Sequence, residues 1–149
     1  MIVFITLAIA INVFIIVEAA MSGETSGNQS GWLSSFIAKI FNITPDEHFH
    51  HLVRKLIGHF SLYVVDGAIT SLAEYYFVKY QNKYSIKVTM ITYLISGMLL
   101  ASISEFVQLL AANRGPAFTD ILINFSGYIL GAIVVFFITF LVKRKRRTE

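Results

Sequence analysis

The sequence predicts an all-α integral membrane protein, a bundle of four transmembrane helices with an extracytoplasmic loop that contains a short interfacial helix. Of its 149 residues, 56% are hydrophobic and only 14% are charged, whereas about 25% of residues are charged in ordinary globular proteins. The apolar residues fall in blocks of roughly 20, the length at which a helix crosses about 30 Å of hydrocarbon. Lipid offers no hydrogen-bond partners to the backbone, so each block is expected to be helical. Residues 1–149 are expected to form a single membrane domain.

Four spans are expected, at about residues 1–18, 55–78, 88–112 and 117–142. The first block has the apolar character of a secretory signal, but it lacks a basic start and exceeds the usual apolar length of about 7 to 15 residues. We therefore expect it to remain in the chain as an uncleaved helix. The other three blocks are each long enough to cross a bilayer with some tilt.

The basic residues predict the orientation of these spans, because short loops rich in Lys and Arg stay on the cytoplasmic side. Five of the twelve basic residues lie in the tail 143–149, and three more lie between the second and third spans, at Lys79, Lys83 and Lys87. Both termini are then cytoplasmic, and the connection that contains Arg114 is outside. The basic run beside a span is a topology signal, so no nucleic-acid partner is expected.

The long outer segment is expected to divide into two parts. Residues 22–31 are rich in Gly, Ser, Thr, Asn and Gln, a composition typical of a loop. Residues 32–43 place large apolar side chains at helical spacing. This part is expected to lie in the membrane surface as a helix, with Trp32 at the level of the headgroups.

The second span is expected to begin as a helix outside the membrane. Thr44 can cap this helix, Pro45 suits its first position, and Glu47 completes a capping box. The helix is then expected to be continuous to about Val78.

Polar side chains from four separate segments are expected at the outer ends of the spans. They are Glu18, Arg54, Lys55, His59, Glu105, Gln108, Arg114, Asp120 and Asn124. A charge at the bilayer centre costs something like 2.5 to 3.5 kcal/mol on insertion scales, so such groups must pair or find water. In the second span one stripe recurs every three or four residues, at Lys55, His59, Tyr63, Asp66 and Thr70. We expect the polar stripes of the helices to face each other around a cavity open to the outside.

These residue types suit the binding of an anionic ligand. Arg54, Lys55 and Arg114 would bind phosphate or carboxylate groups. Glu105, Gln108, Asp120 and Asn124 would orient the basic groups or accept hydrogen bonds from sugars or amides. His59 is a further candidate for ligand binding. In a catalytic alternative, Glu105 or Asp120 is the general base and His59 is an acid or base. In the structural alternative, the charges near the interfaces anchor the helices, and Asp66 and Glu74 are structural.

No metal site and no cofactor is expected. The cluster of Glu47, His48, His50 and His51 contains one pair four residues apart, but its spacing fixes no third ligand. The chain has no cysteine, which excludes thiolate metal sites and disulfides. Gly127 and Gly131 form a GxxxG pattern that lets another helix approach closely, either within the chain or in self-association.

The sequence resembles the VanZ-like family of small bacterial membrane proteins over nearly its whole length. Three segments carry the resemblance: EAAMSGETSGNQSG at residues 18–31, VRKLIGHF at 53–60, and SEFVQ, NRGP and TDILINFSG between 104 and 127. The chain departs from the family pattern at Leu62, before the tyrosine of the second span, and at Asp66. The resemblance implies a multi-pass protein of the bacterial cell membrane, associated with resistance to teicoplanin-type glycopeptide antibiotics.

Three functions are consistent with these residues. The preferred hypothesis is binding of a membrane lipid, a lipid-linked cell-wall precursor or a glycopeptide in the outward polar cavity. The second is a membrane-embedded hydrolase or transferase that acts on a lipid-linked envelope substrate, although no nucleophile is marked. The third is an assembly factor whose helices pack on another membrane protein.

Overall fold

The structure is a computed structural model that describes the backbone of residues 1–21, 23–80, 85–112 and 115–145. Within these ranges the side chains of residues 23–30, 51, 86 and 142–145 are not described. In the part described every element is helical: α1 (Ile2–Ala20), α2 (Gly23–Phe41), α3 (Glu47–Val53), η1 (Arg54–Phe60), α4 (Ser61–Tyr80), α5 (Ile86–Val107), η2 (Gln108–Leu110) and α6 (Phe118–Lys145). The all-α class is therefore confirmed.

Four helical stretches in the described ranges are long and apolar enough to cross a membrane, which confirms the predicted four-span bundle. They are Ile2–Ala20, Glu47–Tyr80, Lys87–Leu110 and Phe118–Leu141. The second stretch is longer than the others because α3, η1 and α4 follow one another without interruption. The predicted continuous helix up to Val78 is thus confirmed.

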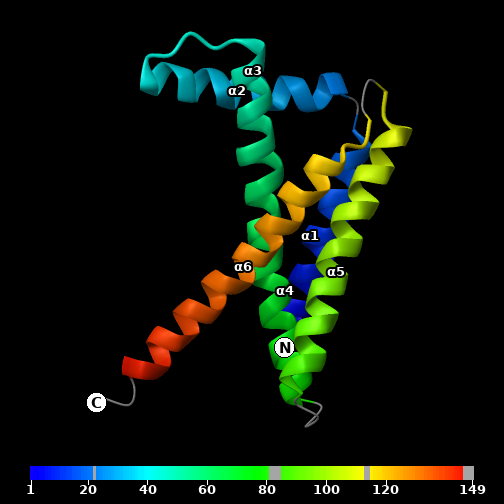
Figure 1. Cartoon of the computed structure of the whole chain (residues 1–149), viewed down its shortest axis with the longest axis vertical. Helices are drawn as coiled ribbons and strands as arrows, with labels where there is room; N and C mark the ends of the chain where they lie inside the picture. The colour runs from blue at the N-terminus through cyan, green and yellow to red at the C-terminus, as the bar shows by residue number, and fades with distance from the viewer. Residues whose placement is uncertain (22, 81–84, 113–114, 146–149) are drawn as a thin grey trace.

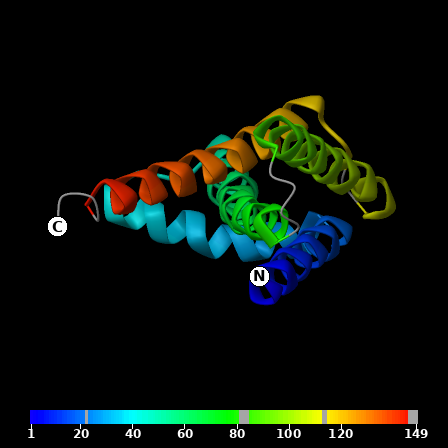
Figure 2. The same cartoon turned by 90° about the horizontal axis from the view of Figure 1, so that it is seen from below.

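The spans form an open bundle that α2 covers at one end. In Figure 1, α1, α4 and α5 run along the long axis, while α2 lies across the top, nearly perpendicular to α4. The first residues of α1 meet the last turns of α4 at the opposite end, where the rings of Phe4 and Tyr76 stack at 5.4 Å. The C-terminal half of α6 diverges from the other helices, as Figure 2 also shows. The ends of α1 and α6 nearest the chain termini both lie away from α2.

The predicted loop at residues 22–31 is wrong, because α2 begins at Gly23 and runs through this polar stretch to Phe41. A helix satisfies its own backbone hydrogen bonds, which matters at a membrane surface, and Gly or Ser inside a helix costs at most about 1 kcal/mol each. The predicted interfacial helix is the second half of α2. It exposes Trp32 and Phe36 on one face and buries Ser34 and Ala38 on the other.

The helix that follows is capped two residues later than predicted. The Oδ1 atom of Asp46 accepts a hydrogen bond of 2.7 Å from the backbone N–H of Phe49, which is the geometry of an N-cap residue. The backbone enters this turn through Asn42, whose φ of 53° is in the left-handed region. Capping by Thr44 is therefore wrong, and Glu47 is the first helical residue.

Small residues bring α6 into close contact with η1 and α4. A Cβ atom at Gly127 would lie 2.6 Å from the carbonyl oxygen of Phe60. A Cβ atom at Gly131 would collide with the backbone of Val64 and Ala68, and one at Gly67 with the backbone of Tyr128. Both glycines of the predicted GxxxG pattern are thus buried against a helix of the same chain.

This packing predicts that Gly131→Ala destabilises the bundle. The added methyl group meets backbone atoms of α4 that cannot move as a side chain can, and overpacking of this kind costs about 1–3 kcal/mol. Heat unfolding in detergent, followed by circular dichroism, should show a lowered midpoint. Gly31→Ala is the matched control, because a Cβ atom at Gly31 has no heavy atom within 4 Å. Equal midpoints for the two variants would contradict the prediction.

Candidate functional site

The part of the second span between α3 and α4 is a π-helix, η1 (Arg54–Phe60). Residues three or four apart share a face of an α-helix, whereas the i→i+5 bonds of a π-helix place residues five apart over one another. Arg54 and His59 are five apart, and both line the same pocket. Their shared direction thus depends on this local change of helix type, which frequently occurs at functional sites.

The pocket lies between α1, α2 and the η1–α4 helix and has a volume of about 380 Å³. Four of its lining residues are polar, namely Glu18, Arg54, His59 and Ser61. The others are Gly58 and six apolar residues: Phe14, Leu33, Val53, Ile57, Leu62 and Val65. The pocket therefore combines ionisable groups with an extended apolar wall.

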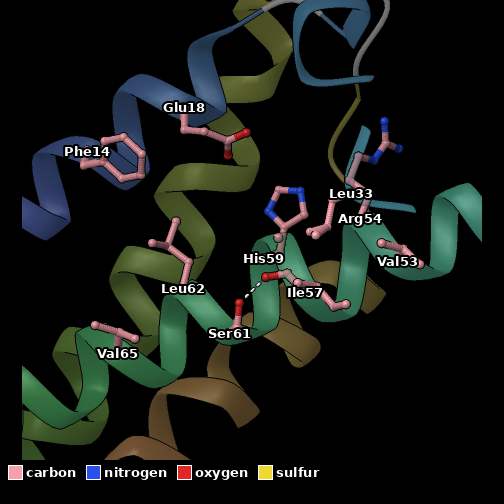
Figure 3. A pocket seen from close by; sticks show the side chains of 11 residues that line it. Phe14, Glu18, Leu33, Val53, Arg54, Ile57, His59, Ser61, Leu62 and Val65 are labelled. Atoms are coloured by element: carbon pink, nitrogen blue, oxygen red, sulfur yellow. Dashed lines mark hydrogen bonds between the residues drawn. The ribbon is translucent and has the colours of Figure 1, made fainter. Parts of the chain in front are cut away.

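Figure 3 shows how the ionisable side chains lie in this pocket. The carboxylate of Glu18, from α1, and the imidazole of His59, from η1, point toward each other. The guanidinium of Arg54 lies on the other side of Leu33. The hydroxyl of Ser61 donates a hydrogen bond to the carbonyl oxygen of Ile57, which lies on the same helix. Groups of both charge signs are thus present in one small volume.

A second set of polar residues, centred on Glu105, lies outside this pocket and joins α5, α6 and their connection. Glu105 is 1% exposed. Its Oε1 atom accepts hydrogen bonds from Gln108 Nε2 at 2.9 Å and from Asn124 Nδ2 at 3.2 Å. Its Oε2 atom accepts one from the backbone N–H of Ala117 at 3.3 Å. Burial of a carboxylate is costly unless such donors compensate it, so Glu105 links the end of α5 to the start of α6.

The first turn of α6 is tied to the second span by an ion pair. The Nζ atom of Lys55 lies 2.6 Å from Oδ1 of Asp120, and both side chains are partly exposed. An exposed ion pair contributes little to stability, about 0–1 kcal/mol. Its main effect here is to orient Lys55 toward α6. Lys55 and Asp120 do not line the pocket.

The candidate residues therefore fall into two groups and do not line one cavity. Arg54 and His59 line the pocket, whereas Lys55, Glu105, Gln108, Asp120 and Asn124 form the contacts around α5 and α6. Lys55 and His59 of the predicted stripe differ in their surroundings, because Lys55 pairs with Asp120 of α6, whereas His59 lines the pocket. Arg114 lies outside the described residues. The α2 end of the bundle nevertheless holds both groups, as expected.

The apolar wall of the pocket and the position of Glu18 in it are not predictable from the sequence. Phe14, Leu33 and Val65 come from three separate helices, and nothing in the sequence distinguishes them from other apolar residues of the spans. The sequence predicts Glu18 only as a polar residue at the end of the first span, and not as a ligand-binding residue. Its distance from the other candidates along the chain gave no signal.

Deeper polar residues of the spans bond to each other. Asp66 is fully buried, and its Oδ1 atom accepts hydrogen bonds of 3.2 Å from Asn12 Nδ2 of α1 and from Thr70 Oγ1. The hydroxyls of Tyr63 and Ser104 lie 2.6 Å apart. These bonds connect α4 to α1 and α5, which agrees with the structural role expected of Asp66.

No group of three or more His, Cys, Asp or Glu side chains with the arrangement of a metal site occurs among the described residues. Of the predicted histidine cluster, His50 forms a short hydrogen bond through Nδ1 with the hydroxyl of Ser34. The side chain of His51 lies outside the described residues. The contact of His50 instead fastens α3 to α2.

These features define a multi-pass helical membrane protein with a mixed polar and apolar pocket at the α2 end of its bundle. The sequence matches the model of the VanZ/LLP1 family over residues 4–140. The chain therefore belongs to this family, as its motifs indicated, and is a VanZ-like membrane protein. Neither the comparison with curated proteins nor the comparison with solved structures found a match.

The hydrogen bonds of Glu105 predict that Glu105→Ala strongly destabilises the protein. The substitution leaves the buried donors on Gln108 and Asn124, and the part-buried N–H of Ala117, without their acceptor, at about 1–3 kcal/mol for each buried unsatisfied group. We expect a loss of about 3 kcal/mol or more in the free energy of unfolding in detergent. Glu47→Ala, at an exposed acidic residue of α3, is the control and should unfold like the unmodified protein. A Glu105→Ala variant as stable as this control would refute the role of Glu105.

Proposed function

We propose that this protein binds the anionic headgroup of a cell-envelope component, a membrane lipid or a lipid-linked cell-wall precursor, in the pocket between α1, α2 and η1. The observation that carries the proposal is the presence of Arg54 and His59 on one wall of this pocket. A guanidinium forms paired, charge-assisted hydrogen bonds with phosphate or carboxylate groups. The imidazole N–H of His59 adds a second hydrogen-bond donor from the same helix.

Glu18 completes this arrangement from the opposite wall. A carboxylate that faces an imidazole fixes the orientation of the ring and the nitrogen that carries its proton. Figure 3 shows the two side chains pointing toward each other, so in our proposal Glu18 acts on His59 in this way. Glu18 also gives the pocket an acceptor for amine or hydroxyl groups of a headgroup. An anionic headgroup that carries such donors is therefore a better fit than a bare phosphate.

The set of polar residues around Glu105 supports the helices that form the pocket. Glu105, Gln108 and Asn124 hold the start of α6, and α6 packs against η1 at Gly127 and Phe60. Lys55 and Asp120 join η1 to α6 directly. In our proposal these residues position the helix that presents Arg54 and His59, and Arg114 adds a cation in the connection between α5 and α6.

We place the pocket on the outer side of the membrane, with both termini in the cytoplasm. Lys79 is in the last turn of α4, and Lys87 is in the first turn of α5. These turns lie at the end of the bundle opposite α2, and the sequence after Val142 adds five more basic residues. Basic residues beside short loops favour the cytoplasmic side.

This placement connects the pocket with resistance to glycopeptide antibiotics, the association that the VanZ-like family implies. The volume of about 380 Å³ lies near the lower limit of about 300 Å³ for pockets that take drug-sized molecules. It suits a headgroup better than a whole glycopeptide. We propose that the protein changes the access of the antibiotic to an envelope component that it holds.

Substitution of Arg54 tests this function. In a glycopeptide-susceptible bacterial host, expression of the unmodified protein should raise the inhibitory concentration of teicoplanin, and Arg54→Ala should abolish this increase because the cation in the pocket is lost. Inhibitory concentrations are compared at matched levels of protein in the membrane. Glu105→Gln and Arg114→Ala should reduce protection in the same assay.

The control for Arg54→Ala is Lys39→Ala. Lys39 is an exposed cation in the last turn of α2 and does not line the pocket. This variant should protect the host as well as the unmodified protein does. Full protection by Arg54→Ala, Glu105→Gln and Arg114→Ala would defeat the proposed function.

One observation favours a second function, a hydrolase or transferase that acts on a lipid-linked envelope substrate. His59 faces Glu18 across the pocket, and a carboxylate that orients an imidazole is a common acid–base pair. Purified protein incubated with lipid-linked precursors should then yield a product of changed mass, and His59→Asn should abolish its formation. Unchanged substrate masses across a broad panel would exclude this second function.

A further inference from the structure

The pocket extends beyond the ionisable residues into the apolar part of the spans. Along the η1–α4 helix its lining runs from Arg54 to Val65. At a rise of about 1.5 Å per residue, the eleven steps from Arg54 to Val65 cover about 16 Å, roughly half of the hydrocarbon thickness of about 30 Å. On the α1 side the lining runs from Glu18 down to Phe14. A ligand that fills the pocket therefore has a polar part at the α2 end and an apolar part below it.

The lower limit of this pocket is a contact between α1 and α4. Asn12 Nδ2 lies 3.2 Å from Asp66 Oδ1. Asn12 precedes Phe14 by two residues in α1, and Asp66 directly follows Val65 in α4. The pocket lies beside and above this hydrogen bond, with residues of α1 and of the η1–α4 helix in its walls, and Leu33 of α2 lines it at the other end. The shape is that of a short vertical cleft between two transmembrane helices.

The cleft is open toward the lipid at its apolar part. Phe14 is 55% exposed and Val65 is 50% exposed, and both belong to helices that are apolar enough to span the membrane. Exposed surface of this kind contacts acyl chains in a bilayer. A ligand already in the bilayer could therefore enter sideways, with its chain remaining in an apolar environment throughout.

From this geometry we infer that the ligand is an anionic membrane lipid that enters laterally from the bilayer, with its headgroup at Arg54 and His59 and the first part of its chain between Phe14 and Val65. The inference rests on the proposed function and specifies the ligand class for the same pocket. Lipid tails are as apolar as the cleft, so transfer of the chain adds little free energy. The headgroup then discriminates among lipids. The bilayer holds the lipid beside the cleft at a high local concentration, an advantage that soluble headgroups lack.

The test uses native mass spectrometry of the full-length protein, released from nanodiscs that contain equal amounts of phosphatidylglycerol and phosphatidylcholine. The unmodified protein should retain phosphatidylglycerol preferentially. Val65→Trp should reduce this retention at least about tenfold, because the indole occupies the space of the chain. Phe14→Trp, from the opposite wall, should act in the same direction. Soluble glycerol phosphate at millimolar concentration should not displace the lipid.

The control is Ile133→Trp, which places the same side chain on an exposed, lipid-facing position of α6 outside the pocket. It should retain phosphatidylglycerol like the unmodified protein. Retention is compared only among variants whose unfolding midpoints match, which separates a filled cleft from a damaged fold. Phe14→Trp provides the second reading if Val65→Trp fails this criterion.

The outcomes separate the inference from the proposed function. Two results would overturn the inference and show that the site recognises headgroups alone. In the first, both Trp variants retain phosphatidylglycerol while Arg54→Ala loses it. In the second, glycerol phosphate displaces the lipid. If Arg54→Ala also retains phosphatidylglycerol as well as the unmodified protein does, the pocket does not bind an anionic headgroup and the proposed function falls with the inference. Loss of retention in both Trp variants and in Arg54→Ala supports both.

Discussion

Close packing of α6 against the η1–α4 helix governs the arrangement of the helices around it. Gly127, Gly131 and Gly67 leave no space for a Cβ atom at this contact. In a membrane, where lipid is as apolar as the helices, association relies on such close packing and on hydrogen bonds between helices. Two tyrosines join α5 to this contact. The rings of Tyr93 and Tyr128 stack at 4.4 Å, and the Tyr93 hydroxyl lies 2.5 Å from the carbonyl oxygen of Tyr128 in α6 and 3.3 Å from that of Gly67 in α4.

This contact also determines which face of the second span remains available for a ligand. With α6 packed on one side of η1, the opposite side faces α1 and α2, and the pocket forms there. The π-helical turn then brings Arg54 and His59 to that side. The polar residues around Glu105 belong to the packed side, where the carboxylate is satisfied by three donors from Gln108, Ala117 and Asn124. One group of polar residues is used for assembly and the other for binding.

This division explains why the polar residues of the α2 end differ so much in exposure. A carboxylate buried among helices is stable when donors surround it, and it is then poorly placed to meet a ligand. A guanidinium that lines an open cleft lies where a ligand can reach it, and its five N–H donors can bind more than one partner. The family motifs span both kinds of residue. Glu105 and Asn124 lie in one motif region and are structural partners, whereas Arg54 and His59 lie in another and line the pocket.

The all-α class, the four spans and the continuous second helix follow from the sequence alone, because apolar blocks about 20 residues long have few alternatives to a transmembrane helix. The family follows from the motifs of the sequence. The sequence also located the polar residues at one end of the bundle. It did not determine that residues 23–31 are helical, since composition alone does not separate a polar helix from a loop. Nor did it place Glu18 opposite His59, or separate Lys55 from His59. These points became visible only in three dimensions, because they depend on contacts between segments far apart in the sequence: α1 lies across the pocket from η1, and Asp120 of α6 pairs with Lys55. The π-helical turn adds the shared direction of Arg54 and His59, which the spacing of a regular α-helix does not give.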